Sequence, residues 1–224
     1  AKKASHSAET QELLSFFSKN KKSFAEIRQS LREAVAEMTK PVATRKSGEA
    51  VLQKAASLFP NLIGGAADLE PSTLTVIKSS KAISAADYSG RNIHFGVREH
   101  AMGALANGLA YYGGYIPFCS TFLVFSDYMR TPMRVAALSH LQSLFVFTHD
   151  SVLLGEDGPT HQPVEHLASL RCIPNIVVYR PADAVEVADC YAHALSRTSS
   201  PSILILSRQN VTPLPTTAEG RNVE

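Results

Sequence analysis

The stretch Leu144-Phe145-Val146-Phe147-Thr148-His149-Asp150 joins a run of apolar residues directly to two titratable side chains. Four apolar residues in succession are typical of a central parallel strand, which other elements cover on both faces. His149 would then lie at the carboxyl end of this strand, where open α/β sheets bind their ligands. The loop that it opens, residues 149–163, holds two histidines, three carboxylates and two hydroxyls. Such a loop is predicted to be functional, the alternative being a Gly- and Pro-rich surface turn.

Short apolar segments alternate with helical patterns from Pro41 onward. We expect helices between successive strands, so that each strand is followed by a crossover. This order predicts an α/β fold: a doubly wound, mainly parallel six-stranded sheet with helices on both faces. The expected strands are residues 62–63, 93–95, 115–118, 144–148, 176–179 and 203–206, and the expected helices are residues 48–59, 99–112, 121–138, 163–171 and 184–196.

The two ends of the chain differ from this pattern. Ser23-Phe24-Ala25-Glu26 is a capping box that predicts a helix to about Met38, and an earlier amphipathic piece covers residues 9–17. Residues 1–40 are therefore expected to form a helical linker or arm. The Pro- and Thr-rich residues 212–224 are expected to be an exit linker to a missing C-terminal domain, which leaves residues 41–211 as the α/β domain.

Composition excludes several classes of protein. Hydrophobic residues make up 45% of the chain, charged ones 19%, and the net charge is only +2, so the long-range field of a nucleic-acid binder is absent. No apolar run reaches the length of a membrane span, and the start lacks a signal-peptide core. The three widely spaced cysteines indicate thiols in a reducing compartment, and thus a cytoplasmic protein. His149 and His161 lack a suitably spaced third ligand, so no metal site is expected.

Polar residues follow the other expected strands as well. Gly64-Gly65-Ala66-Ala67-Asp68 comes after the first strand, where the two glycines permit a close approach of backbone. Ser120-Thr121 follows the third strand and Ser207-Arg208-Gln209-Asn210 the sixth. No nucleotide fingerprint of the GxGxxG or GxxxxGK[ST] type occurs.

Two further features allow more than one interpretation. Glu99 opens a helix of small apolar residues, so its carboxylate faces either the positive end of the helix dipole or a ligand. Phe122, Phe125 and Tyr128 are spaced three apart, on one face of the helix expected after the third strand. Such an aromatic stripe is either part of the core or a surface on which a flat ligand stacks.

Three motifs together resemble the pyrimidine-binding domain of the transketolases, a thiamine diphosphate-dependent family. They are Gly64-Gly65-Ala66-Ala67-Asp68-Leu69, Val97-Arg98-Glu99-His100-Ala101-Met102-Gly103 and the loop from Gly155 to Pro163. The resemblance extends from about Pro41 to Asn210. It implies the central domain of an enzyme of the pentose phosphate pathway that transfers a two-carbon ketol unit between sugar phosphates.

The resemblance also implies residue roles. Glu99 would activate the cofactor, so it is expected to be catalytic, together with His149 and His161. Phe122, Phe125, Tyr128 and Asp68 would bind the thiamine diphosphate. The residues expected to hold the sugar phosphate are Arg45, Ser72, His149, Asp157, His161 and Arg208.

In the family, the diphosphate and its Mg²⁺ (or Ca²⁺) are bound by a separate diphosphate-binding domain, which belongs to the other subunit of a homodimer. The isolated chain would thus supply half of a site, and is expected to be inactive. Its linker-like start favours a fragment over one half of a naturally split enzyme.

Three alternatives remain open at this point. Dihydroxyacetone synthase and deoxyxylulose phosphate synthase share the same chemistry, and the intact Gly155 to Pro163 loop disfavours the second of them. A flavodoxin-like binding module without catalysis would be expected to have lost Glu99 or Asp157, and both are present.

Overall fold

The sheet at the centre of the protein has five parallel strands, and its order is β2-β3-β4-β6-β5. The computed structural model describes residues 8–17 and 22–215. The strands are β2 (Leu62–Ala66), β3 (Ile116–Phe122), β4 (Leu144–Thr148), β5 (Val177–Tyr179) and β6 (Ser202–Ile205). This confirms the α/β, doubly wound, parallel fold, with β4 buried along its whole length as expected.

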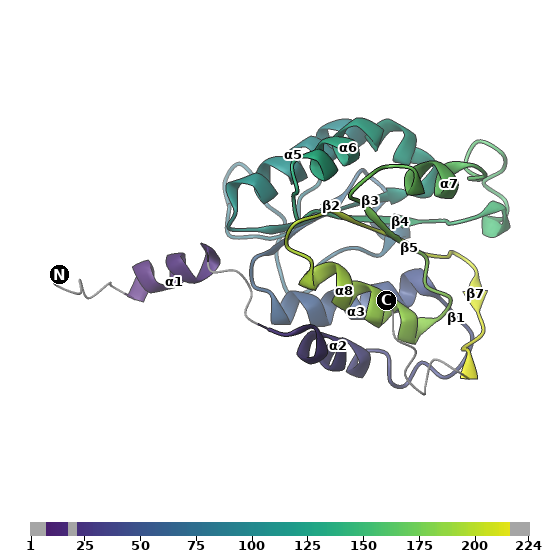
Figure 1. Cartoon of the computed structure of the whole chain (residues 1–224), viewed down its shortest axis with the longest axis horizontal. Coiled ribbons are helices and arrows are strands. Elements are labelled where there is room, and N and C mark those ends of the chain that lie inside the picture. Colours follow the sequence, from purple (N-terminus) through teal and green to yellow (C-terminus); the bar gives the residue numbers. More distant parts are fainter. Residues whose placement is uncertain (1–7, 18–21, 216–224) are drawn as a thin grey trace.

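Helices cover both faces of the sheet, as Figure 1 shows. One layer holds α5 (Glu99–Tyr112), α6 (Arg130–Leu138) and α7 (His166–Arg171), and the other holds α2 (Phe24–Glu33), α3 (Thr44–Leu58) and α8 (Ala184–Ser196). The 3₁₀ helix η1 (Leu123–Met129) packs against α5, α6 and α7 of the first layer. Each layer buries its own apolar cluster against the sheet. The bounds expected for α5 and α8 are confirmed, whereas α3 begins four residues early. The short elements are α1 (Ala8–Phe17), α4 (Glu70–Thr73) and η2 (Val152–Leu154).

The segment before the α/β domain packs into it. The capping box of Ser23 and Glu26 starts α2 as predicted. The helix ends at Glu33 and not near Met38, because the amides of Ala34 and Val35 bond to carbonyls three residues back and tighten the chain into turns. Ile27, Leu31 and Val35 are buried in the same cluster as α3 and α8.

A buried carboxylate fastens α2 to α8. Asp189 on α8 is 2% exposed and accepts two hydrogen bonds from Arg28, at 2.9 and 3.0 Å, and two from Arg32, at 2.7 and 2.6 Å. Burial raises the pKa of Asp189, but the hydrogen bonds from Arg32 and Arg28 outweigh it and hold the pKa below its ordinary value. Two forked guanidiniums thus satisfy one carboxylate.

The strand expected at residues 93–95 is not part of the sheet. This segment runs beside β2 and forms one bridge, between Gly64 and Asn92, with Ile93 donating to the Gly64 carbonyl at 2.8 Å. Gly64 also donates to the Arg91 carbonyl at 3.0 Å and Phe95 to the Ala66 carbonyl at 3.4 Å, so the segment follows the edge of β2, but with too few regular bonds to form a strand. The Ile93 carbonyl lies 2.0 Å from where a Cβ of Gly65 would be, so this approach requires the glycine. The sequence pattern could not separate this contact from a sixth strand.

Strand β3 is longer than the sequence indicated. Ser120 and Thr121, expected in a loop, lie within the strand and are buried, paired with Val146 and Phe147 of β4. Gly64 makes room for the strand, because a Cβ there would come within 1.9 Å of the Phe118 carbonyl oxygen. The close backbone approach expected of the glycine pair is therefore confirmed.

A short antiparallel pair joins the two ends of the domain. β1 (Val42–Ala43) pairs with β7 (Asn210–Val211), and next to it the Thr44 and Ser207 side chains exchange hydrogen bonds with each other's backbone amides at 3.0 and 2.6 Å. This pairing carries Arg45 to the end of β6 that Arg208 follows. Among the described helices, none has the length and hydropathy needed to cross a membrane.

Candidate active site

The carboxyl ends of the parallel strands bring distant residues to one edge of the sheet. Phe122 ends β3, His149 directly follows β4, and Arg208 comes shortly after β6. Asp68 and His149, which follow β2 and β4, both have positive φ angles, of 65° and 59°. A left-handed backbone at a residue other than glycine is disfavoured, and it concentrates at functional sites.

His149 is held on two sides. Its ring stacks on Phe122 with the centroids 3.6 Å apart, and its Nδ1 lies 2.9 Å from the Thr148 hydroxyl. Burial, and then Arg45 and Arg208, lower the pKa of His149 to about 4, while Asp157 and Asp150 partly oppose the shift. The imidazole is therefore neutral at pH 7, and able both to donate and to accept a hydrogen bond.

The aromatic residues form a row, although not on an α-helix. Phe122 ends β3, and Phe125 and Tyr128 belong to the 3₁₀ helix η1, where residues three apart lie above one another. Ring centroids are 6.0 Å apart from Phe122 to Phe125 and 6.3 Å from Phe125 to Tyr128. The helix expected over residues 121–138 is thus split into η1 and α6, because β3 runs on to Phe122.

His161 joins this row from the loop after β4. Its ring meets Phe125 edge-on at 5.4 Å and Phe122 at 6.2 Å, and its Nδ1 lies 2.9 Å from the Thr160 hydroxyl. The structure therefore brings His149 and His161, which lie 12 residues apart, around one phenyl ring.

Glu99 is a buried residue in the first turn of α5, where it is 9% exposed. Helix α5 packs against β3 and η1, the two elements that carry the aromatic row. Within the residues that the structure describes, no side-chain hydrogen bond or ion pair engages this carboxylate. Its carboxylate oxygens are not among the buried polar atoms that lack a partner, so they remain accessible to a ligand.

Arg45, Ser72 and Arg208 form a basic cluster near His149. Arg45 donates to the Ser72 carbonyl at 2.5 Å, and its Nε is buried without a partner among the described residues. Burial lowers the pKa of Arg45, and the nearby Arg208 lowers it further. Arg208 is paired only loosely, at 3.8 Å, with the exposed Glu156. Two cations with free donors at one place are suited to an anion such as phosphate.

Asp157 and Asp68 are both exposed, in different surroundings. Asp157 lies within electrostatic reach of His149. Asp68 lines a cavity of about 380 Å³ together with His94 and Arg98. Glu70 also lines this cavity and pairs with His94 at 3.4 Å, which no motif indicated.

Metal-ligating side chains also meet away from these residues, in the described part of the chain. Asp127 on η1 and Glu165 and His166 at the start of α7 each place one ligand atom within 4.8 Å of the others. His166 Nε2 lies 3.2 Å from the Asp127 carboxylate, an ordinary ion-pair distance. Neither His149 nor His161 belongs to this group.

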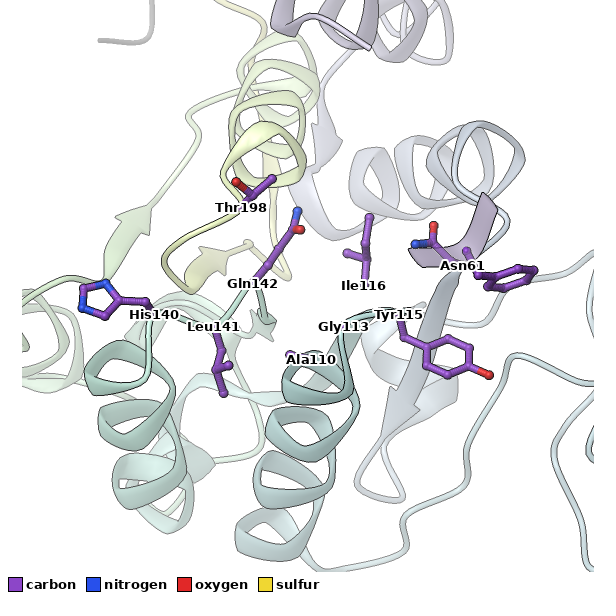
Figure 2. A pocket seen from close by; sticks show the side chains of 10 residues that line it. Asn61, Ala110, Gly113, Tyr115, Ile116, His140, Leu141, Gln142 and Thr198 are labelled. Carbon is purple, nitrogen blue, oxygen red and sulfur yellow. The ribbon is translucent and has the colours of Figure 1, made fainter. Parts of the chain in front are cut away.

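A further cavity, of about 160 Å³, lies at the other end of the sheet (Figure 2). Its lining includes Asn61, Ile116 and Gln142, at or just before the starts of β2, β3 and β4. None of the candidate residues lines it. The candidate residues therefore lie away from this cavity.

Comparison with known proteins matches residues 40–213 to the family described as "Transketolase, pyrimidine binding domain". The transketolase of Physarum polycephalum is 56% identical over 171 residues, which are 76% of this chain and 26% of that protein. A transketolase of Pichia stipitis solved in complex with sedoheptulose 7-phosphate is 50% identical, with a TM-score of 0.76 over 78% of this chain and 27% of that one.

A structure described as "Split gene transketolase, inactive beta4 tetramer" is also similar. It is 26% identical with a TM-score of 0.61, over 77% of this chain and 54% of that one. The chain spans about a quarter of the length of the curated transketolases that it matches. On the extent of the family match and the identity to these enzymes, the chain belongs to the transketolase pyrimidine-binding domain family.

Proposed function

We propose that this chain is the pyrimidine-binding part of a transketolase, which moves a two-carbon ketol unit from a ketose phosphate to an aldose phosphate. The observation that carries the proposal is Glu99, a residue 9% exposed in the first turn of α5, whose carboxylate has no side-chain partner in the described part of the chain. Helix α5 packs against β3 and η1, the elements that carry the aromatic row. A ligand nitrogen would supply a partner for the carboxylate. In this role, the Glu99 carboxyl holds a proton in a hydrogen bond to a ring nitrogen of the cofactor pyrimidine.

The aromatic row fits the same ligand. Phe125 is half-buried and Tyr128 is 64% exposed, so part of each ring can be reached by a flat heterocycle. Phe122 is buried beneath His149 and supports the row from below. Thiamine diphosphate, when bound, supplies the nucleophilic carbon for ketol transfer. Asp68 is proposed to complete the cofactor site from the end of β2.

The basic cluster is proposed to bind the phosphate of the sugar. Arg45 and Arg208 supply charge-assisted donors, and Ser72 adds a hydroxyl beside Arg45. His149, neutral at pH 7, and His161 would bind sugar hydroxyls near the reacting carbon and transfer protons there. Asp157 would select the configuration of a neighbouring hydroxyl. The sugar phosphate complex of the Pichia stipitis enzyme supports this substrate class.

The remaining partners follow from the same proposal. Mg²⁺ or Ca²⁺ and the cofactor diphosphate would be held by a diphosphate-binding domain of the other subunit in a homodimer. The isolated chain would then bind cofactor weakly and turn over nothing, and the similar split-gene chain described as inactive is consistent with this. We propose the cytoplasm as the compartment, because the three cysteines form no disulfide, as is usual for proteins in a reducing environment.

The test is reconstitution. The chain is mixed with the diphosphate-binding domain of a related transketolase, and ketol transfer from xylulose 5-phosphate to ribose 5-phosphate is followed with and without thiamine diphosphate. Cofactor-dependent turnover by the mixture, but by neither part alone, is expected. Turnover with formaldehyde as the preferred acceptor would indicate a dihydroxyacetone synthase. A well-folded mixture that binds cofactor and transfers no ketol unit would contradict the proposal.

A further inference from the structure

Asp150, directly after His149, is the centre of a polar contact that no motif indicated. Its side chain is 7% exposed and accepts two hydrogen bonds from Arg180 on one oxygen, from Nε at 3.0 Å and from Nη2 at 2.8 Å. The other oxygen accepts a longer one from Gln209 at 3.4 Å. A carboxylate this buried, with both oxygens engaged, has a fixed orientation.

The three residues come from three different strand ends. Asp150 follows β4, Arg180 comes directly after β5, and Gln209 lies between β6 and β7. These strands are neighbours, because β6 lies between β4 and β5 in the sheet. The contact therefore ties together three loops at the edge where His149 and Arg208 lie.

His149 needs such support. Its φ of 59° is disfavoured for an L-residue, and the Thr148 hydroxyl and the Phe122 ring restrain the imidazole but not the chain that leaves it. Asp150 fixes the chain on that side. Gln209 is next to Arg208 in the chain, so its hydrogen bond to Asp150 also restrains the backbone that carries Arg208, the second cation proposed to bind phosphate.

We propose that Asp150, clamped by Arg180 and Gln209, is a positioning residue that holds His149 on Phe122 and Arg208 beside it in the geometry that binds a sugar phosphate. The substrate part of this inference rests on the proposed function, whereas the positioning part concerns this chain alone. Arg180 also neutralises a carboxylate that would otherwise repel an incoming phosphate.

The experiment reads the stacking of His149 directly. In the 224-residue chain with labelled histidine, the ring protons of His149 should be shifted strongly upfield by Phe122, with its centroid at 3.6 Å. Arg180→Gln keeps the length of the side chain and removes the forked cation, and we expect it to lose most of this upfield shift. Arg180→Lys keeps the charge with a single donor group, and we expect an intermediate shift.

Lys54→Gln is the matched control, because it breaks a surface ion pair of the same type, with Glu33 at 2.9 Å. It should leave the His149 shift at its original value. An unchanged shift in Arg180→Gln would overturn the proposal, and so would an equal loss in Lys54→Gln, which would report a general loosening of the fold. Neither result depends on turnover, so failure of the reconstitution assay leaves this test intact.

Discussion

The imidazole of His149 stacks on the phenyl ring of Phe122 at a centroid distance of 3.6 Å and an interplanar angle of 25°. The contact joins the ends of β3 and β4. It also places the proposed cofactor-stacking row in direct contact with His149, the proposed sugar-binding histidine. A substitution of Phe122 should therefore alter the position of the His149 ring.

Phe122→Leu should destabilise the protein by about 1 to 2 kcal/mol, because it removes a buried ring and the stacking contact between that ring and His149. Urea unfolding of the 224-residue chain measures this. Tyr128→Leu, at an exposed position in the same row, should change the stability by no more than about 0.5 kcal/mol. Equal losses in both variants would show that the stack contributes nothing of its own.

Glu99→Ala should leave the fold intact and lower turnover of the reconstituted enzyme by at least about 100-fold, the usual range for loss of a proton-handling group. Glu99→Gln keeps the hydrogen-bonding shape without an acidic proton, and should recover cofactor binding more than turnover. Calorimetry with thiamine diphosphate and a coupled assay separate the two effects. Near-normal turnover in Glu99→Ala would exclude the proposed role.

Arg45→Ala should raise the KM for ribose 5-phosphate by about 10-fold or more, because a charge-assisted hydrogen bond to the phosphate is lost. Its kcat should change far less. Lys46→Ala removes an exposed neighbouring charge and serves as the control. A KM that rises equally in both variants would point to a diffuse field and not to a placed guanidinium.

The free energy of unfolding should fall as the pH drops from 6.5 to about 4. In this window the unfolded chain protonates His149 at its ordinary pKa of 6.5, while the folded protein, with a pKa of about 4, keeps it neutral. The loss amounts to at most about 3.5 kcal/mol, at about 1.4 kcal/mol per pKa unit. Below pH 4 this contribution stays constant.

His149→Gln isolates that part of the pH dependence. Burial and Arg197 also lower the pKa of His193, so the parent protein contains a second contribution of the same sign. Urea titrations at pH 7, 5.5 and 4 should show a flatter profile in the variant than in the parent. Parallel profiles would mean that the pKa of His149 is not lowered in the folded protein.

Asp189→Asn should cost about 2 to 3 kcal/mol, since it leaves the guanidiniums of Arg28 and Arg32 without their carboxylate. Those arginines are partly exposed, which keeps the loss below that of a fully buried pair. Glu33→Gln, in an exposed pair with Lys54, should cost less than about 1 kcal/mol. Chemical unfolding and protease cleavage before residue 41 report whether α2 has been released.

Features encoded within a few residues were predicted well. The helices at residues 99–112 and 184–196, the capping box at Ser23 and the buried strand β4 all depend on local hydrogen bonds or a local apolar pattern. The three motifs also indicated the family, and the match over residues 40–213 confirms it. Such signals are present in the chain whatever its neighbours are.

Only the tertiary structure decided what depends on residues far apart in the chain. Three features join segments about 26 or more residues apart: the approach of residues 93–95 to Gly65, the continuation of β3 through Ser120 and Thr121, and the Asp150 contact with Arg180 and Gln209. A single sequence carries no local mark of such a contact. The strand order and the packing between layers create it, and these are set by burial across the whole domain.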